Sequence, residues 1–202
     1  MGAEAKCTAT ISGKKAVGKA LLETDELIFR GEDVRLKIPY KSVSSIDAKD
    51  GVLHIAWLSG VASFELGPQA VKWADRIRNP PSRIDKLEVK PGQLVLFVGI
   101  RDTTLREEIE TRGATVLARP IQPVDAVFVA ANERGDLKRL ATVQNFLKRD
   151  GAIWVIRPKG SPNISENDVM AAGKGVGLVD VKVVRFSETH TAEKFVIPVS
   201  ER

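Results

Sequence analysis

The sequence has one cysteine, two histidines and few aromatic residues. Cys7 alone cannot form an internal disulfide or a thiolate metal cluster. His54 and His190 are far apart in the chain, in no spacing that is typical of a metal site or a catalytic dyad, so we expect no metal. Aromatic residues make up 5% of the chain, which argues against a surface on which nucleic-acid bases stack.

Long apolar runs are also missing. No stretch approaches the roughly 20 residues of a membrane-spanning helix, and residues 1–22 have no continuous apolar segment like that of a signal peptide. The sequence therefore predicts a cytoplasmic protein without a transmembrane segment. The 31 basic residues are interleaved with 26 acidic ones, so the net charge of +5 is not gathered into a basic tail and nucleic acid is not a favoured partner.

Up to about residue 78 the chain consists of short stretches that alternate apolar and polar residues, which is typical of antiparallel strands. Asp-Gly at 50–51 and Ser-Gly at 59–60 supply tight turns between them. Residues 68–79, PQAVKWADRIRN, then place Ala70, Trp73, Ala74 and Ile77 on one helical face. About seven strands followed by one helix resemble the pleckstrin-homology-like β-barrel, an α+β fold in which the helix closes one open end.

Pro80 and Pro81 end this helix and stiffen the chain after it. The sequence predicts a β-barrel domain at residues 1–78, a proline-rich linker at 79–83 and a second domain at 84–202. In the second domain strands and helices alternate, which predicts an α/β sheet of four parallel strands that ends in an antiparallel hairpin. We expect strands at 93–99, 114–120, 124–131, 152–158, 179–187 and 193–199, and helices at 104–113, 136–151 and 165–177.

Three segments carry a more specific resemblance. KPGQLVLFVG at 90–99, DGAIWVIRPKG at 150–160 and GLVDVKVVRFSETHTAEKFV at 177–196 resemble an uncharacterised bacterial family of methyltransferase-like domains of unknown function. The resemblance spans residues 84–199 and implies a Rossmann-type α/β domain. The family has no established activity that could be carried over to this chain.

The resemblance to methyltransferases makes the missing glycines informative. Those enzymes hold S-adenosylmethionine with a glycine-rich turn after the first strand and an acid after the second, which accepts hydrogen bonds from the ribose. Here the turn has one glycine, Gly99, and Arg119 lies where the acid is expected, although arginine cannot accept a hydrogen bond. We therefore expect a degenerate S-adenosylmethionine site and no cofactor. The glycines of GKGVG at 173–177 end a helix, with Gly177 as its cap, and do not form a phosphate loop.

Basic residues occupy the edge where α/β sheets bind ligands, outside the carboxyl ends of the strands. We hypothesise an anion pocket there, with Arg101 and Arg119 as bidentate clamps. The alternative is that these are ordinary exposed loop residues. The candidate residues are Arg101, Arg119, Asn132, Arg157 and Lys159, with Arg134 nearby.

Three functions remain open at this point. The favoured one is a non-enzymatic binding or scaffolding protein with a degenerate cofactor site, whose partner is a small anionic ligand or a protein. The second is an atypical S-adenosylmethionine-dependent methyltransferase or another transferase. The third is a sensor of anionic ligands or membrane surfaces that uses the basic residues at 12–19 of the first domain. The sequence does not establish whether the protein is an enzyme.

Overall fold

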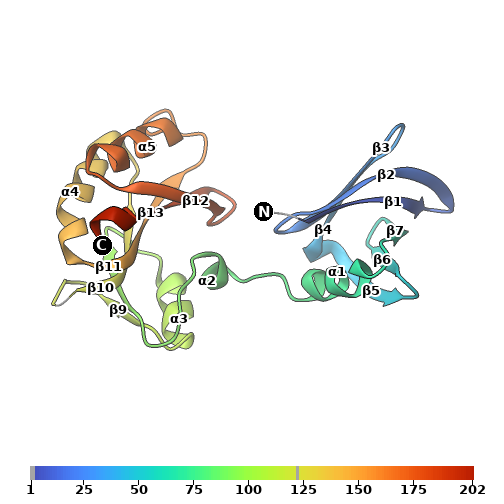
Figure 1. Cartoon of the computed structure of the whole chain (residues 1–202), viewed down its shortest axis with the longest axis horizontal. Coiled ribbons are helices and arrows are strands. Elements are labelled where there is room, and N and C mark those ends of the chain that lie inside the picture. Colours follow the sequence, from blue (N-terminus) through green and yellow to red (C-terminus); the bar gives the residue numbers. More distant parts are fainter. Residues whose placement is uncertain (1–2, 122) are drawn as a thin grey trace. The chain divides into compact units, whose positions relative to one another are not determined.

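The computed structural model describes residues 3–121 and 123–202. The chain divides into two compact units, residues 1–81 and residues 82–202 (Figure 1). Among the described residues no helix is long and apolar enough to cross a membrane.

The first unit is a curled antiparallel sheet of seven strands with one helix. The strands lie in the order β4-β3-β2-β1-β7-β6-β5. Their bounds are β1 Ala3–Ile11, β2 Lys14–Leu22, β3 Glu26–Gly31, β4 Arg35–Pro39, β5 Val43–Lys49, β6 Val52–Trp57 and β7 Gly60–Glu65. The 3-10 helix η1, Tyr40–Ser42, connects β4 to β5. The predicted strands are thus present, whereas the likeness to a pleckstrin-homology-like barrel stays a prediction.

The helix α1, Gln69–Arg78, buries the face that the sequence predicted. Ala70, Trp73, Ala74 and Ile77 pack into the apolar core of this unit, and Trp73 is only 1% exposed. Because a large buried aromatic contributes several kcal/mol of burial, roughly 3–5 by truncation to alanine, Trp73 is a structural residue.

The sheet curls at β1. This strand pairs with β2 along its whole length but with β7 only over Ala9–Ile11. Gly18 in β2 allows the tight approach of β3, because a Cβ there would lie 2.5 Å from the carbonyl oxygen of Arg30. A groove on the outer face of this sheet is lined by residues of β1, β7, β6 and β5.

The second unit begins at Ser82, whose hydroxyl accepts a hydrogen bond from the N–H of Asp85 and caps the short helix α2, Arg83–Lys86. Arg83 binds Asp102 (2.7 Å) and Glu108 (2.9 Å). Ser82 and Arg83, which we placed in the linker, therefore make their contacts within the second unit.

The second unit contains a mixed six-stranded sheet in the order β12-β13-β11-β10-β8-β9. Strands β9, β8, β10 and β11 are parallel, and β13 and β12 form the antiparallel hairpin at the edge. The predicted α/β sheet is confirmed. Its strands are β8 Leu94–Val98, β9 Thr115–Leu117, β10 Val124–Ala130, β11 Leu147–Pro158, β12 Val179–Arg185 and β13 His190–Val196.

Helices cover both faces of this sheet. On one face α2 and α3, Thr103–Thr111, pack Ile84, Leu105 and Ile109 against the strands. On the other face lie η2 Arg134–Arg139, α4 Leu140–Val143, η3 Gln144–Phe146 and α5 Glu166–Gly175. The short 3-10 helix η4, Val199–Glu201, follows β13. The capping box of Ser165 and Asp168 at the start of α5 is present as predicted.

The GKGVG segment ends α5, as predicted. Gly177 has a φ of +81°, and the N–H of Leu178 donates to the carbonyl oxygen of Gly173 (3.0 Å), which closes the helix.

The predicted helix at 136–151 is wrong in its second half. The helical segments end at Phe146, and β11 starts at Leu147, which pairs with Val124. Gly151 lies inside this strand, and glycine is needed there because a Cβ would come within 2.8 Å of the carbonyl oxygen of Asp125. The glycine permits a bulge between β10 and β11. The sequence predicts a helix through Leu147 because the spacing of Leu147 from Val143 fits a helix as well as a strand.

Candidate functional site

A cavity of about 220 Å³ opens at the carboxyl ends of β8, β10 and β11. This is the edge at which open α/β sheets bind ligands. Its walls come from the segment after β8, the end of β10 and β11, and the turn between β12 and β13. The lining residues are Gly99, Ile100, Arg101, Asp102, Ala130, Asn132, Ile156, Phe186, Ser187 and His190.

One side of the cavity is apolar and held in place. Phe186 lies under the guanidinium of Arg83, whose central carbon is 4.9 Å from the ring centroid. Burial disfavours the charged form of Arg83, but hydrogen bonds to Glu108 and Asp102 outweigh this effect and raise its pKa. Arg83 is therefore a fixed cation that holds the ring of Phe186 in place at this side of the cavity.

Other residues that line the cavity are polar. Arg101 is exposed and makes no ion pair or hydrogen bond within residues 3–121 and 123–202. Asp102 caps α3 by accepting the N–H of Leu105 (2.8 Å) and is neutralised by Arg83. His190 lies with Nδ1 2.9 Å from the hydroxyl of Thr189. The lining of the cavity thus combines apolar side chains with an arginine that has no partner among the described residues.

Gly99 turns the chain at the end of β8 with a φ of +73°, which favours glycine. The space beside its α-carbon is filled by Arg139, whose Nη1 lies 3.2 Å from the position that a Cβ would take. Arg139 is held there by the carbonyl oxygen of Ala130 (3.3 Å) and by Asp136 (3.0 Å). A second cation therefore covers the backbone of the turn.

The structure brings only part of the predicted cationic edge together. Arg101 and Asn132 line the same cavity, whereas Arg119 is exposed after β9 and does not line it. Lys159 donates hydrogen bonds to the carbonyl oxygens of Ser187 (2.8 Å) and Glu188 (3.3 Å), so it stabilises the turn beside the cavity. Arg134 pairs with Asp168 (2.9 Å).

Arg157 requires a correction. We expected it at the ligand-binding edge, after the fifth strand of the sheet. It instead lies within β11 and is 7% exposed, and its Nη2 lies 2.8 Å from Oε1 of Glu193. The strand extends through Pro158 because β13 pairs with β11 along its length. Arg157 is therefore not available to a ligand at the sheet edge.

Sequence reasoning missed Phe186, Ser187, His190 and Arg139. His190 was expected in an exposed turn and Ser187 at the end of the strand before it. Both reach the cavity because the order of the strands brings this hairpin next to the end of β11. Arg139 was assigned to a regular helix, where its direction could not be known. No local sequence signal identifies these residues.

S-adenosylmethionine does not fit this arrangement. A carboxylate to accept hydrogen bonds from its ribose is lacking after β9, where Arg119 stands, and Arg139 covers the glycine at which the ligand would approach the backbone. The volume also lies below the roughly 300–1,000 Å³ of typical ligand sites. Among the described residues no cluster of His, Cys, Asp or Glu could hold a metal ion.

The chain was compared with curated protein sequences and with solved structures. No curated protein sequence matches the chain. Similar solved structures include an S-adenosylmethionine-dependent methyltransferase from Aquifex aeolicus (18% identity, TM-score 0.46, covering 58% of this chain and 94% of that one). Others are a ribosomal protein L11 methylase from Lactobacillus delbrueckii (11%, 0.46, 57% and 74%) and a TehB-like methyltransferase from Corynebacterium glutamicum (15%, 0.40, 64% and 96%).

The model of one protein family matches more than half of the chain, residues 84–199. This range contains every residue that lines the cavity at the sheet edge. The chain belongs to this family, DUF3052, which is described as a protein family of unknown function.

Proposed function

We propose that the α/β domain binds a small anionic ligand at the carboxyl edge of its sheet and does not use S-adenosylmethionine. The observation that carries this proposal is the exposed Arg101, which has no partner among the described residues and lines a cavity that also has apolar lining residues. The guanidinium of Arg101, which lines the same cavity as Asn132, offers directed hydrogen-bond donors to a phosphate or a carboxylate.

The residues that line the cavity narrow the range of possible ligands further. Ile100, Ile156 and Phe186 provide an apolar surface that suits a hydrocarbon or ring portion of the ligand. Asp102 does not repel an anion strongly, because its charge is balanced by Arg83 at 2.7 Å. The proposed ligand is therefore small and has one anionic group and one apolar part. The role is binding, and no residue is assigned a catalytic step.

The proposal is tested by thermal unfolding in phosphate and in chloride at equal ionic strength. Phosphate is expected to raise the melting temperature more than chloride does, because a directed contact adds to general screening. Arg101→Gln should remove most of that difference and leave the melting temperature in chloride nearly unchanged, since an exposed substitution costs within about 0.5 kcal/mol.

Two arginines provide matched controls. Arg119 and Arg149 are exposed and do not line the cavity, so Arg119→Gln and Arg149→Gln should keep the full response to phosphate. An equal response of the Arg101→Gln variant and the parent would overturn the proposal. Loss of the response in Arg119→Gln would instead support the clamp of Arg101 and Arg119 that the sequence suggested.

The atypical methyltransferase remains the competing function. A ligand at 100 times its dissociation constant stabilises a protein by roughly 2.7 kcal/mol, which a melting curve detects. We expect no shift with S-adenosylmethionine at millimolar concentration. A clear upward shift would favour the methyltransferase and contradict the proposal.

A further inference from the structure

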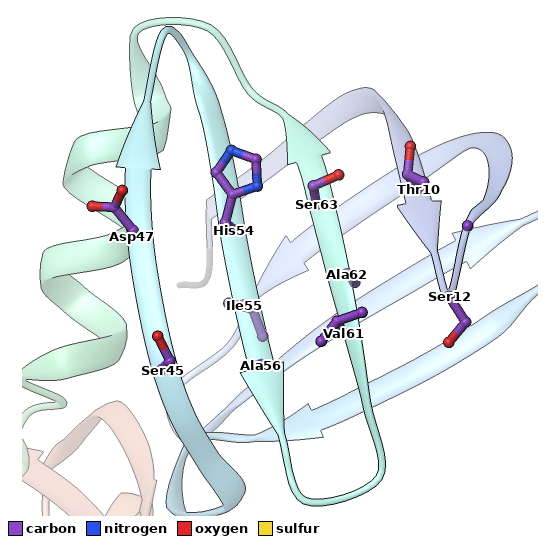
Figure 2. Close-up of a pocket in the computed structure, with 11 residues that line it drawn as sticks. Thr10, Ser12, Ser45, Asp47, His54, Ile55, Ala56, Val61, Ala62 and Ser63 are labelled. Atoms are coloured by element: carbon purple, nitrogen blue, oxygen red, sulfur yellow. The ribbon is translucent and has the colours of Figure 1, made fainter.

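A row of polar side chains crosses the outer face of the first unit. Lys15 lies opposite Thr10, Thr10 opposite Ser63, Ser63 opposite His54, and His54 opposite Asp47, on five successive strands. Directly opposite residues in antiparallel strands point to the same face of the sheet. Figure 2 shows four of the five side chains, from Asp47 to Thr10, side by side on that face. We call these five residues the outer row.

The outer row faces away from the core. The residues beside it along the strands, Ala9, Leu53, Ile55, Ala62 and Phe64, are at most 5% exposed and belong to the apolar core. Next to the row is a groove of about 290 Å³, whose other side carries Ser12, Ser45, Ala56 and Val61 (Figure 2). The row and the groove form one accessible surface.

The polar groups of the outer row are not used within the unit. Over residues 3–121 and 123–202, the side chains of Lys15, Thr10, Ser63 and His54 make no hydrogen bond or ion pair. The Asp47 side chain is 70% exposed, and the guanidinium of Arg78 lies 3.9 Å from it, at the limit of an ion pair. All five side chains can therefore bind an external partner.

The two charged residues of the outer row lie at equal distances from its centre and have opposite signs. Lys15 lies at one end, Asp47 at the other and Ser63 in the middle. The ends are about 19 Å apart, from four strand spacings of roughly 4.8 Å. A two-fold axis that passes through Ser63, lies in the contact plane and runs perpendicular to the row would place Lys15 of each copy against Asp47 of the other, and Thr10 against His54.

We propose that the outer row is a self-complementary surface through which two copies of this chain associate. In a two-fold dimer the same patch meets itself, so a cation at one end requires an anion at the other. A ligand of one charge, such as nucleic acid, would be attracted at one end of the row and repelled at the opposite end. The groove beside Asp47 gives the long Lys15 side chain of the second copy room to enter.

The strength of this association follows from its chemistry. The interface contains two exposed ion pairs and hydroxyl groups, with the small apolar patch of Ala56 and Val61 beside them. Exposed ion pairs contribute little and are screened by salt. The dimer is therefore weak and salt-sensitive, and it forms at high protein concentration.

The test measures sedimentation of the full chain over a concentration series. The parent should associate at about 50 mM salt, and its dissociation constant should rise roughly tenfold at about 500 mM, since the Debye length shortens. Lys15→Asp and Asp47→Lys should each raise the dissociation constant about tenfold or more, because like charges then face each other at both ends. An equal mixture of the two variants should restore association, since every facing pair is again of opposite charge.

Lys14→Asp is the matched control. Lys14 has the same charge and is also exposed, but it precedes Lys15 in β2 and points to the other face of the sheet, so this variant should associate like the parent. A parent that stays monomeric over the whole series would overturn the proposal. A mixture of Lys15→Asp and Asp47→Lys that stays monomeric would overturn it as well, because the loss in the single variants would then have another cause.

Discussion

At the scale of single residues, the buried carboxylate of Glu193 is the least expected feature. Its side chain is 0% exposed, and Arg157 approaches one oxygen at 2.8 Å but without the angle of a good hydrogen bond. Glu166 lies 3.6 Å from the same guanidinium. Burial raises the pKa of Glu193 to about 6, against the opposing effect of Arg157.

This carboxyl group makes stability depend on pH. Its pKa in the folded state lies above the unfolded value of 4.5, so its contribution is complete below pH 4.5 and is lost as the pH rises through about 6. The free energy of unfolding should fall by roughly 2 kcal/mol over this window, from 1.36 kcal/mol per pKa unit. Urea unfolding at a series of pH values from 4.5 to 7 measures this change.

Two variants distinguish the titration of Glu193 from that of its neighbours. Glu193→Gln, which resembles the protonated form, should flatten the dependence between pH 4.5 and 7. Glu166→Gln removes the exposed carboxylate beside the same guanidinium and should leave the dependence in place. A slope that survives in Glu193→Gln would assign the titration to a different group.

At the scale of elements, α5 shows how a glycine can set a packing distance. A Cβ on Gly173 would lie 2.3 Å from the ring of Phe195 in β13, and Phe195 is 1% exposed. The helix can therefore rest on the sheet only with glycine at this position. Gly175, in the same helix, has no neighbour within 4 Å of such a Cβ.

The two glycines allow a comparison within one helix. Gly173→Ala should lower the free energy of unfolding by roughly 1–3 kcal/mol, because the helix or the ring must move. Gly175→Ala should be neutral or stabilising by less than about 1 kcal/mol, since alanine favours the helix and meets nothing. Urea denaturation of the two variants gives both values, and equal effects would show that α5 is not held against Phe195 in this way.

At the scale of the whole molecule, the chain consists of two compact units that meet at residues 81 and 82. Each has its own apolar core, one around Phe29, Phe64 and Trp73 and the other on both faces of the mixed sheet. The second unit holds its first residues firmly through the capping box of Ser82 and Asp85 and through the ion pairs of Arg83.

Limited proteolysis tests whether the junction is the weakest part of the chain. We expect trypsin to cleave first after Arg78 and to spare the bond after Arg83, because Arg83 lies in α2 and is bound to Asp102 and Glu108. Mass spectrometry should then find two resistant fragments. Early cleavage inside either unit, with the junction intact, would contradict the division into two domains.

The sequence by itself determined the elements whose apolar pattern fits only one type of secondary structure. The face of α1 with Trp73, the capped start of α5 and the mixed sheet follow from local periodicity and capping residues. The single glycine at 99 and the arginine at 119 also predict that S-adenosylmethionine is not bound, and this stays a prediction. Leu147 was misread because an apolar residue after Val143 fits a helix and a buried strand equally well.

Only the tertiary structure decided which polar residues act together. Pairing of β11 with β13 buried Arg157 against Glu193, and the order of the strands brought His190 and Phe186 to the cavity beside Arg101. The register of five strands aligned Lys15 with Asp47 at opposite ends of the outer row. Such contacts join residues far apart in the chain, and local sequence cannot specify them because they depend on how the strands pair and how the sheet twists.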